Sequence, residues 1–328
     1  MKILIIRLSS IGDIVLTSPV VRCLAQQTSH EVHYLTKKQN IQLLENNPNI
    51  TKLIPFDGDL KEIIKLLKKE NYDYVIDLHN NIRSLYLKLK LRLPSKNLNK
   101  LNLKKWIYTF FKINLMSDKH FVTRCLDTAK RFKIKTDGLG LDLYLSDQTK
   151  LPENISFPEK YIAFAVGTQH FTKTIPEEYI IKIIKKINDL FPVVLIGGNK
   201  EKEVGEKIAS LCDNVFNYAG QLDLQQSALI IKNSELVLAG DTGMMHIAAA
   251  LKKNLISLWA STTPELGVSP YFPDDFKGVN LLIERKDLKC RPCGKFGKKK
   301  CPRKHFECGK YSDEQISAIR NIILQRIK

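Results

Sequence analysis

The chain lacks any long uncharged run. None of its 328 residues lie in an apolar stretch that approaches the length of a bilayer-spanning helix. At the N-terminus, Met1 and Lys2 lead into Ile3–Ile6, an apolar run too short for the core of a secretory signal. We therefore expect a soluble, cytoplasmic protein. In that compartment its seven cysteines are not expected to form a disulfide framework.

The chain also lacks the usual nucleotide-binding fingerprints. Neither the P-loop spacing nor GxGxxG is present, which argues against an NAD-dependent oxidoreductase. No motif of a nucleic-acid-binding fold appears either, and the basic residues are not interleaved with aromatics, so nucleic acid is not the expected partner.

Positive charge is what the chain has in excess. It carries 52 Lys and Arg against 34 Asp and Glu, a formal net charge of +18. Such an excess suits an acidic partner, either a phosphorylated substrate or the headgroups on the inner face of the inner membrane. The alternative is a lysine-rich surface without a dedicated partner.

Strand and helix patterns alternate along the first half of the chain. Lys2–Ile6 and Tyr74–Leu78 are short apolar runs typical of buried strands, and Leu60–Leu67 has helical spacing, with a further helix from about Ile14. Strands that are apolar on both faces favour a parallel sheet covered by helices. The stretch Leu85–Leu93 fits both periods, and we favour a helix there.

The same alternation restarts after a change in composition. From about Ser146 to Lys160, prolines, Asn154 and charged residues replace the periodic pattern, which predicts a linker. Four strand patterns then alternate with helices: Tyr161–Val166, Pro192–Ile196, Glu235–Ala239 and Asn254–Trp259. The sequence thus predicts an α/β protein with doubly wound domains at 1–152 and 153–310, and a capped helix in 311–328.

The loops after the predicted strands are the candidate ligand sites, because open parallel sheets bind ligands at the carboxyl ends of their strands. After the first strand, Gly12 allows a tight turn, and Asp13 can accept a proton from an incoming hydroxyl. The alternative for Asp13 is a first-turn carboxylate stabilised by the helix dipole.

Two loops of the second domain could meet an anion. In the first, Lys173 follows a polar stretch, and its alternative is an ordinary exposed lysine. In the second, Asp241-Thr-Gly243 separates a strand from a helix, so the amides of Thr242 and Gly243 would form a diphosphate site with the helix dipole behind them. His246 would donate to the same group, or else be a core histidine.

Together these stretches resemble glycosyltransferase family 9, the heptosyltransferases of lipopolysaccharide core assembly. The resemblance spans nearly the whole chain in the right order. Two departures fall near the expected donor site, with Ile175 where Trp is usual and Ala260 where Gly is usual. The matching stretches are Arg7–Asp13 with Thr17–Pro19, Tyr74–His79 with Arg83 and Ser84, Lys173–Pro176, Asp241–Gly243 with His246–Ala249, and Trp259–Thr262.

The resemblance implies a GT-B fold, in which two Rossmann-like domains face each other across a cleft and the last helix packs back toward the N-terminal domain. It implies inverting, metal-independent transfer of heptose from ADP-heptose to an anionic inner-core acceptor of lipopolysaccharide, with no cofactor. A family relative that uses another nucleotide sugar or another surface glycan is the alternative.

The resemblance also assigns roles to individual residues. Asp13 would be the general base. The donor site would comprise Thr168, Lys173, Glu201, Asp241, Thr242, Gly243 and His246. The acceptor site would comprise Ser10, Gly12, His79 and Arg83.

A cysteine-rich basic segment lies near the C-terminus. Four thiolates suffice for a tetrahedral zinc site, but the segment has only one CxxC pair, so free thiols are the alternative. The cationic surroundings could instead contact anionic lipid. The four residues are Cys290, Cys293, Cys301 and Cys308.

Overall fold

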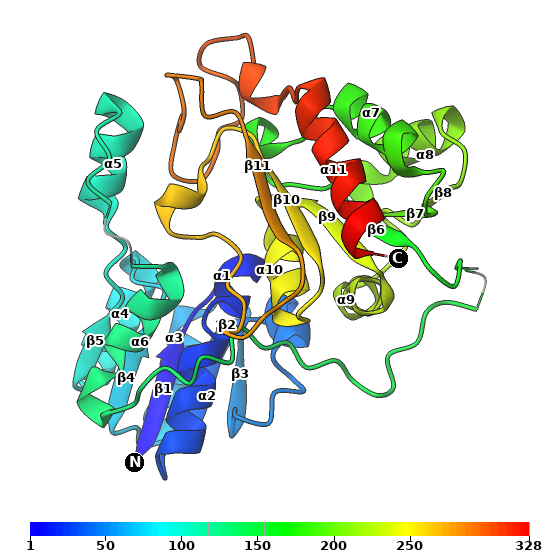
Figure 1. Ribbon diagram of the computed structural model, residues 1–328. Helices are drawn as coiled ribbons and strands as arrows, with labels where there is room; N and C mark the ends of the chain where they lie inside the picture. The colour runs from blue at the N-terminus through cyan, green and yellow to red at the C-terminus, as the bar shows by residue number, and fades with distance from the viewer. Residues whose placement is uncertain (117–118, 154, 156, 328) are drawn as a thin grey trace. The chain divides into compact units, whose positions relative to one another are not determined.

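The computed structural model describes residues 1–116, 119–153, 155 and 157–327, and the chain forms two compact units (Figure 1). Unit 1 comprises Met1–Lys100, Lys119–Ser146 and Tyr271–Asp275. Unit 2 comprises the described residues of Leu101–Asp118, Asp147–Pro270 and Phe276–Lys328.

Unit 1 is built on a five-stranded parallel sheet in the order β3-β2-β1-β4-β5. Its central strands are fully buried because they are apolar on both faces. Ile6 of β1 pairs with Asp77 of β4, so the loops after these two strands start side by side. The strands are β1 (Lys2–Ile6), β2 (Glu31–Lys37), β3 (Lys52–Phe56), β4 (Tyr74–Asp77) and β5 (Ser95–Asn97).

Helices complete unit 1. They are α1 (Ile11–Val15), α2 (Ser18–Gln27), α3 (Leu60–Lys69), α4 (Ile82–Leu91) and α6 (Phe121–Thr128), with 3-10 turns at Lys38–Leu43 and Lys130–Phe132. The predicted helix at Leu85–Leu93 is thus present as α4. Its apolar face is not buried, however, because Ile82, Leu85 and Leu89 are exposed and Leu87 is the side chain that enters the core.

Unit 2 is built on a six-stranded parallel sheet in the order β11-β10-β9-β6-β7-β8. The chain runs outward from β6 on one side and then returns to β9 on the other, which makes the β6–β9 junction a topological switch point. The strands are β6 (Ile162–Ala165), β7 (Val193–Ile196), β8 (Val215–Asn217), β9 (Leu236–Gly240), β10 (Leu255–Trp259) and β11 (Asn280–Glu284).

Six α-helices belong to the described part of unit 2: α5 (Asn102–Phe111), α7 (Glu177–Ile187), α8 (Lys202–Leu211), α9 (Leu224–Asn233), α10 (Gly243–Ala250) and α11 (Asp313–Arg326). The last of these begins with the predicted capping box, in which Ser312 and Gln315 exchange hydrogen bonds. Its apolar residues Ile316, Ile319 and Ile323 join the core of unit 2 with α7. This face packs there because α7 offers a matching isoleucine row at Ile180, Ile183, Ile184 and Ile187.

The division of the chain differs from the single predicted boundary. The chain passes from unit 1 to unit 2 between Ser146 and Asp147, at the start of the predicted linker rather than at residue 152. The segment 101–116 joins unit 2, and 271–275 joins unit 1, where the Asp274 amide donates to the Gly138 carbonyl at 2.9 Å. The linker residues Asn154 and Ser156, like Lys328, lie outside the described residues.

The first helix also starts earlier than predicted. It begins at Ile11 rather than about Ile14, and Gly12 is its buried second residue with an ordinary helical position rather than a turn. Within the described residues, no helix is both long and apolar enough to cross a bilayer.

Candidate active site

In unit 1 the predicted acceptor-side residues gather at the junction of β1 and β4. Asp13 and Ser10 follow β1, and His79 and Arg83 follow β4. All five strands are parallel, so these loops leave the same edge of the sheet, at the point where strand order reverses. That edge is where open α/β sheets bind ligands.

Asp13 is held by a buried arginine. Its Oδ2 lies 2.5 Å from Nη2 of Arg7 and accepts hydrogen bonds from the Ser10 hydroxyl at 2.9 Å and the Ser10 amide at 3.2 Å. Arg7 in turn donates to the Leu78 carbonyl after β4 at 2.5 Å. The Asp13 side chain remains 28% exposed, so it is oriented by these partners but still reachable.

The electrostatics keep this carboxylate ionised. Burial raises the pKa of Asp13, but the charge of Arg7 and the hydrogen bonds from Ser10 outweigh it and place the pKa below the usual range of an aspartate. Arg7 was not among the predicted site residues, although it opens the Arg7–Asp13 motif.

His79 is a neutral polar group at the same junction. Burial and the charges of Arg7 and Lys100 lower the pKa of His79 to about 4, against the smaller opposing effects of Asp77 and Asp13. Its Nδ1 is buried and has no hydrogen-bond partner among the described residues. A neutral imidazole can donate to or accept from a sugar hydroxyl.

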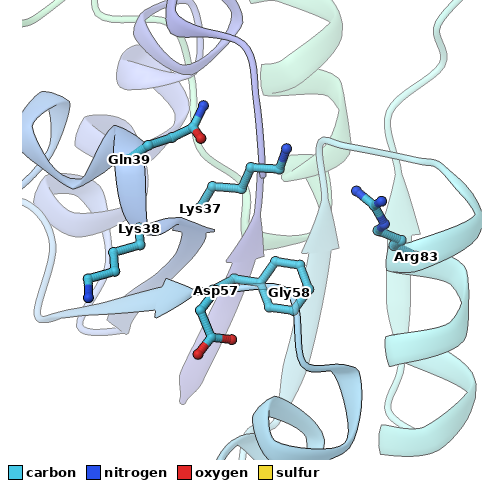
Figure 2. A pocket seen from close by; sticks show the side chains of 7 residues that line it. Lys37, Lys38, Gln39, Asp57, Gly58 and Arg83 are labelled. Carbon is cyan, nitrogen blue, oxygen red and sulfur yellow. The ribbon is translucent and has the colours of Figure 1, made fainter.

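Arg83 lines a cationic pocket of about 620 Å³ at the carboxyl ends of β2 and β3 (Figure 2). The pocket is also lined by Lys37, Lys38 and Asp57. Figure 2 shows the head groups of Lys37 and Arg83 on one side, and those of Lys38 and Asp57 turned the other way. The two lysines were missed by sequence reasoning because they follow β2 without any motif.

In unit 2 the predicted donor residues gather at the switch point between β6 and β9. Lys173 ends the loop after β6, and Asp241 directly follows β9. The Lys173 ammonium lies 2.7 Å from Asp241 Oδ2 and donates to the Asp241 carbonyl at 3.2 Å. Thr262, after β10, donates to the same Oδ2 at 2.6 Å. Thr262 was missed as a site residue, although it ends the Trp259–Thr262 motif.

The N-terminus of α10 faces the same loops. Thr242 is its N-cap residue, Gly243 its first residue, and the first amides of a helix lack intrahelical partners. The Thr242 hydroxyl is buried and has no hydrogen-bond partner among the described residues. His246, one turn into α10, is only 5% exposed. The arrangement combines a dipole, a hydroxyl and a lysine, the groups that a diphosphate requires.

Glu201 sits over the ends of β6 and β7. Its Oε2 accepts from the Gly198 amide at 2.9 Å, and a Cβ built on Gly167 would come within 3.0 Å of that carboxylate. Gly167 therefore leaves room for Glu201 beside the strand end. Thr168, next in the loop, uses its hydroxyl to accept from the His170 amide at 3.3 Å, which shapes the loop.

Comparison with known proteins identifies the family. The model of glycosyltransferase family 9 (heptosyltransferase) matches residues 60–295, well over half of the chain. The chain belongs to glycosyltransferase family 9. It is 26% identical over 317 residues to lipopolysaccharide heptosyltransferase 1 of Campylobacter coli, covering 87% of this chain and 89% of that protein.

Solved structures share the fold of this family 9 glycosyltransferase. A family 9 glycosyltransferase from Veillonella parvula superposes with a TM-score of 0.77 at 18% identity, covering 99% of this chain and 97% of the other. ADP-heptose lipopolysaccharide heptosyltransferase II of E. coli gives 0.69 at 20%, covering 98% and 100%. The α/β class and the GT-B fold predicted from the resemblance are thereby confirmed.

The two departures of this glycosyltransferase from the family pattern can now be placed. Ile175 is 4% exposed and lies in the hydrophobic core of unit 2, and Ala260 is 1% exposed. Ile175 therefore contributes to the hydrophobic core two residues after Lys173.

The cysteine-rich segment of the glycosyltransferase is hydrogen-bonded to the loop that carries Lys173. The Thr172 amide donates to the Lys298 carbonyl at 3.1 Å, and the Lys298 amide donates to the Thr172 hydroxyl at 2.7 Å. Arg291, buried within the CxxC pair, donates to the Ala260 and Thr262 carbonyls and pairs with Glu284 at 2.9 Å. Arg291 was missed because nothing in the cysteine pattern indicates its role.

The zinc site at the four thiols of this segment stays a prediction. Among the described residues, no three His, Cys, Asp or Glu side chains are arranged to hold a metal. Cys290, Cys293, Cys301 and Cys308 are all free thiols, and burial raises the pKa of Cys308 to about 12.

Proposed function

We propose that this protein transfers heptose from ADP-heptose to an inner-core acceptor of lipopolysaccharide, with inversion at the anomeric carbon. The observation that carries the proposal is the anion site at the β6–β9 switch point, where Lys173, the Thr242 hydroxyl and the N-terminus of α10 converge. The names of the family relatives supply the donor: one is a lipopolysaccharide heptosyltransferase, another an ADP-heptose heptosyltransferase.

In the proposed step Asp13 is the general base. Its carboxylate takes the proton of an acceptor hydroxyl while that oxygen forms a bond to the anomeric carbon of the donor. The bond from the anomeric carbon to the diphosphate breaks on the opposite face, and ADP leaves with the bonding electron pair. Attack opposite to the leaving group inverts the configuration.

The leaving diphosphate would be stabilised in unit 2. A lysine ammonium has three N–H donors, and the Asp241 side chain and carbonyl take two of those of Lys173. The third donor, the Thr242 hydroxyl and the amides at the start of α10 remain for the phosphates. Because these groups offset the developing charge, we propose a metal-independent reaction in which His246 adds a further donor.

The acceptor would be held in unit 1. The Lys37 and Arg83 head groups in the cationic pocket suit a carboxylate or phosphate on an anionic saccharide. Such an acceptor is carried on a lipid, so we also propose a cytoplasmic protein that works at the inner face of the inner membrane. The +18 net charge supports that location.

A thermal-shift screen tests the donor. ADP-heptose and ADP should raise the melting temperature, because a ligand that binds only the folded state stabilises it, while UDP-sugars, GDP-sugars and NAD should not. Thr242→Val should lose much of the shift, because Val keeps the shape of the side chain but cannot hydrogen-bond a phosphate. Thr149→Val, a threonine of unit 2 outside the site, is the matched control.

The screen can also refute the donor. Stabilisation by another nucleotide sugar alone would leave the family assignment standing and overturn ADP-heptose as donor, in favour of the alternative that the sequence left open.

A further inference from the structure

Helix α5 exposes an unusual density of large apolar side chains. Leu103, Trp106, Phe110 and Phe111 are 69%, 51%, 67% and 54% exposed, and Ile113, just beyond the helix, is 55% exposed. Scattered single apolar residues are normal on a surface, but a contiguous patch marks an interaction site. The proposed transfer chemistry makes no use of this patch.

The aromatic rings of the patch pack on one another. The Trp106 and Phe110 rings stack with centroids 5.5 Å apart, and Phe111 meets them edge-on at 5.4 Å and 4.9 Å. They form a preformed apolar ridge that costs little conformational entropy to bury.

The opposite face of α5 is already occupied. Lys112 donates from its ammonium to the Cys290 carbonyl at 3.0 Å and the Pro292 carbonyl at 2.7 Å, and the Tyr108 hydroxyl donates to Glu265. Tyr108 and Lys112 are four residues apart and lie on one side of the helix, whereas Trp106 and Phe110 lie on the other. The apolar ridge is thus the free face of an anchored amphipathic helix.

A basic stretch of the chain lies beside the start of α5. Lys295 donates to Asn102 at the start of α5 at 3.1 Å, and its neighbour Phe296 is 54% exposed. No Asp or Glu occurs between Leu288 and Phe306. The exposed lysines and arginines of residues 295–304 are Lys295, Lys298, Lys299, Lys300, Arg303 and Lys304.

We propose that the free face of α5 and the basic stretch 295–304 form a membrane-binding surface for a bilayer rich in anionic phospholipid. A ridge of Trp and Phe beside a basic stretch that contains no Asp or Glu matches the layer where acyl chains lie just beneath negative headgroups. Two weak signals of this kind, apolar insertion and charge, together give stable but reversible anchoring. The inference rests on the proposed function for its biological sense, because a lipid-borne acceptor lies in that layer.

Tryptophan fluorescence tests the surface directly. The chain has two tryptophans, Trp106 on the ridge and Trp259 fully buried in β10, so a change on adding vesicles reports Trp106. With vesicles of phosphatidylglycerol and phosphatidylethanolamine, the emission should shift to the blue, and brominated acyl chains should quench it. Vesicles of phosphatidylcholine alone should have little effect, and high salt should weaken the response.

Paired variants separate the two signals in vesicle co-sedimentation. Phe110→Ser should lower partitioning on the order of tenfold, because a ring loses its apolar burial, while Leu211→Ser, another half-exposed residue of unit 2, should not. Lys299→Gln/Lys300→Gln should lower it roughly 30-fold at low salt, at about 1 kcal/mol per cation. Lys185→Gln/Lys186→Gln removes the same charge from α7 and should have little effect.

Several results would overturn the proposal. Equal vesicle binding by the Phe110→Ser and Leu211→Ser variants would show that α5 takes no part in membrane binding. A blue shift that depends on protein concentration, and not on lipid, would show that the ridge is a contact between copies of this chain. Salt-sensitive binding to duplex DNA without vesicle binding would assign the cations to nucleic acid. Because the vesicles contain neither donor nor acceptor, these failures leave the transferase proposal intact, and loss of transfer leaves the vesicle result intact.

Discussion

Both units place an ion-paired carboxylate just after a central strand, but the two carboxylates differ in access. Asp13 pairs with Arg7 at 2.5 Å and keeps 28% of its side chain exposed. Asp241 pairs with Lys173 at 2.7 Å, accepts from Thr262 and keeps only 6% exposed. The topology is the same, since each lies where strand order reverses in its sheet.

The difference in exposure suits the two carboxylates to different roles, one in proton transfer and one in positioning a neighbouring group. An ionised carboxylate that is oriented yet reachable suits proton acceptance, so Asp13 is the candidate base. A carboxylate enclosed by an ammonium and a hydroxyl cannot easily take a proton from a substrate, so Asp241 instead fixes the Lys173 ammonium beside α10. The contacts of Asp241 with Lys173 and Thr262 both use its Oδ2.

The largest expected effect is from Asp13→Asn. The amide cannot accept the proton, so kcat should fall about 10²–10⁴-fold while ADP still stabilises the folded protein. Steady-state kinetics and thermal shifts on the same preparations measure both. If Asp241→Asn lowered kcat as much and Asp13→Asn left it unchanged, the assignment of roles to the two carboxylates would be reversed.

Removing Lys173 should affect donor binding more strongly than it affects the proposed proton-transfer step. Lys173→Ala should raise the donor KM about 10–100-fold, from the loss of a hydrogen bond to a charged group, and should destabilise the fold because Asp241 loses its partner. The double variant Lys173→Ala/Asp241→Asn provides the control.

That double variant should recover stability in urea but not donor affinity. Recovery of both would mean that Lys173 acts only through Asp241 and does not touch the diphosphate.

The pH dependence of activity sharpens the account of Asp13. A base with a lowered pKa is lost only as pH falls through that low value, so the acid limb of kcat/KM should lie below the usual aspartate range. Ser10→Ala removes one hydrogen bond that lowers the pKa, and should move this limb to higher pH. Stability that comes from the same lowered pKa is present at neutral pH and lost on acidification. Ser210→Ala, whose hydroxyl bonds only the Lys207 carbonyl among the described contacts, should leave the limb in place.

The smallest effect is expected at Gly167. A Cβ there would come 3.0 Å from the Glu201 carboxylate, so Gly167→Ala should push Glu201 aside and raise the donor KM a few-fold, with kcat little changed. An unchanged donor KM would show that Glu201 does not contribute to donor binding.

Much of the fold could be predicted because most of the central strands coincide with short apolar runs in the sequence. β1, β4, β6, β7, β9 and β10 match the predicted strands to within a residue at each end. The edge strands β3, β5, β8 and β11 were missed, since they are short or partly exposed and carry weaker patterns. Local order also cannot show that 101–116 joins unit 2, which depends on contacts such as Lys112 with Pro292.

The site shows the same limit. Asp13, Lys173 and Asp241 stand out in sequence because each follows a strand within a motif. Their partners do not, because Arg7 and Thr262 act through side-chain contacts that only the folded chain brings together. The exposure of Ile82 and Leu89 on α4 is a further example, since an apolar helix face in sequence does not say whether a partner covers it.

The most direct test of the account is transfer itself, measured by mass spectrometry on a heptose-free lipopolysaccharide inner-core acceptor incubated with ADP-heptose and the purified protein. We expect the acceptor to gain one heptosyl residue, with release of an equal amount of ADP, and Asp13→Asn to slow both about 10²–10⁴-fold. An unchanged acceptor with ADP-heptose, together with sugar transfer from a different nucleotide donor, would contradict the proposed function.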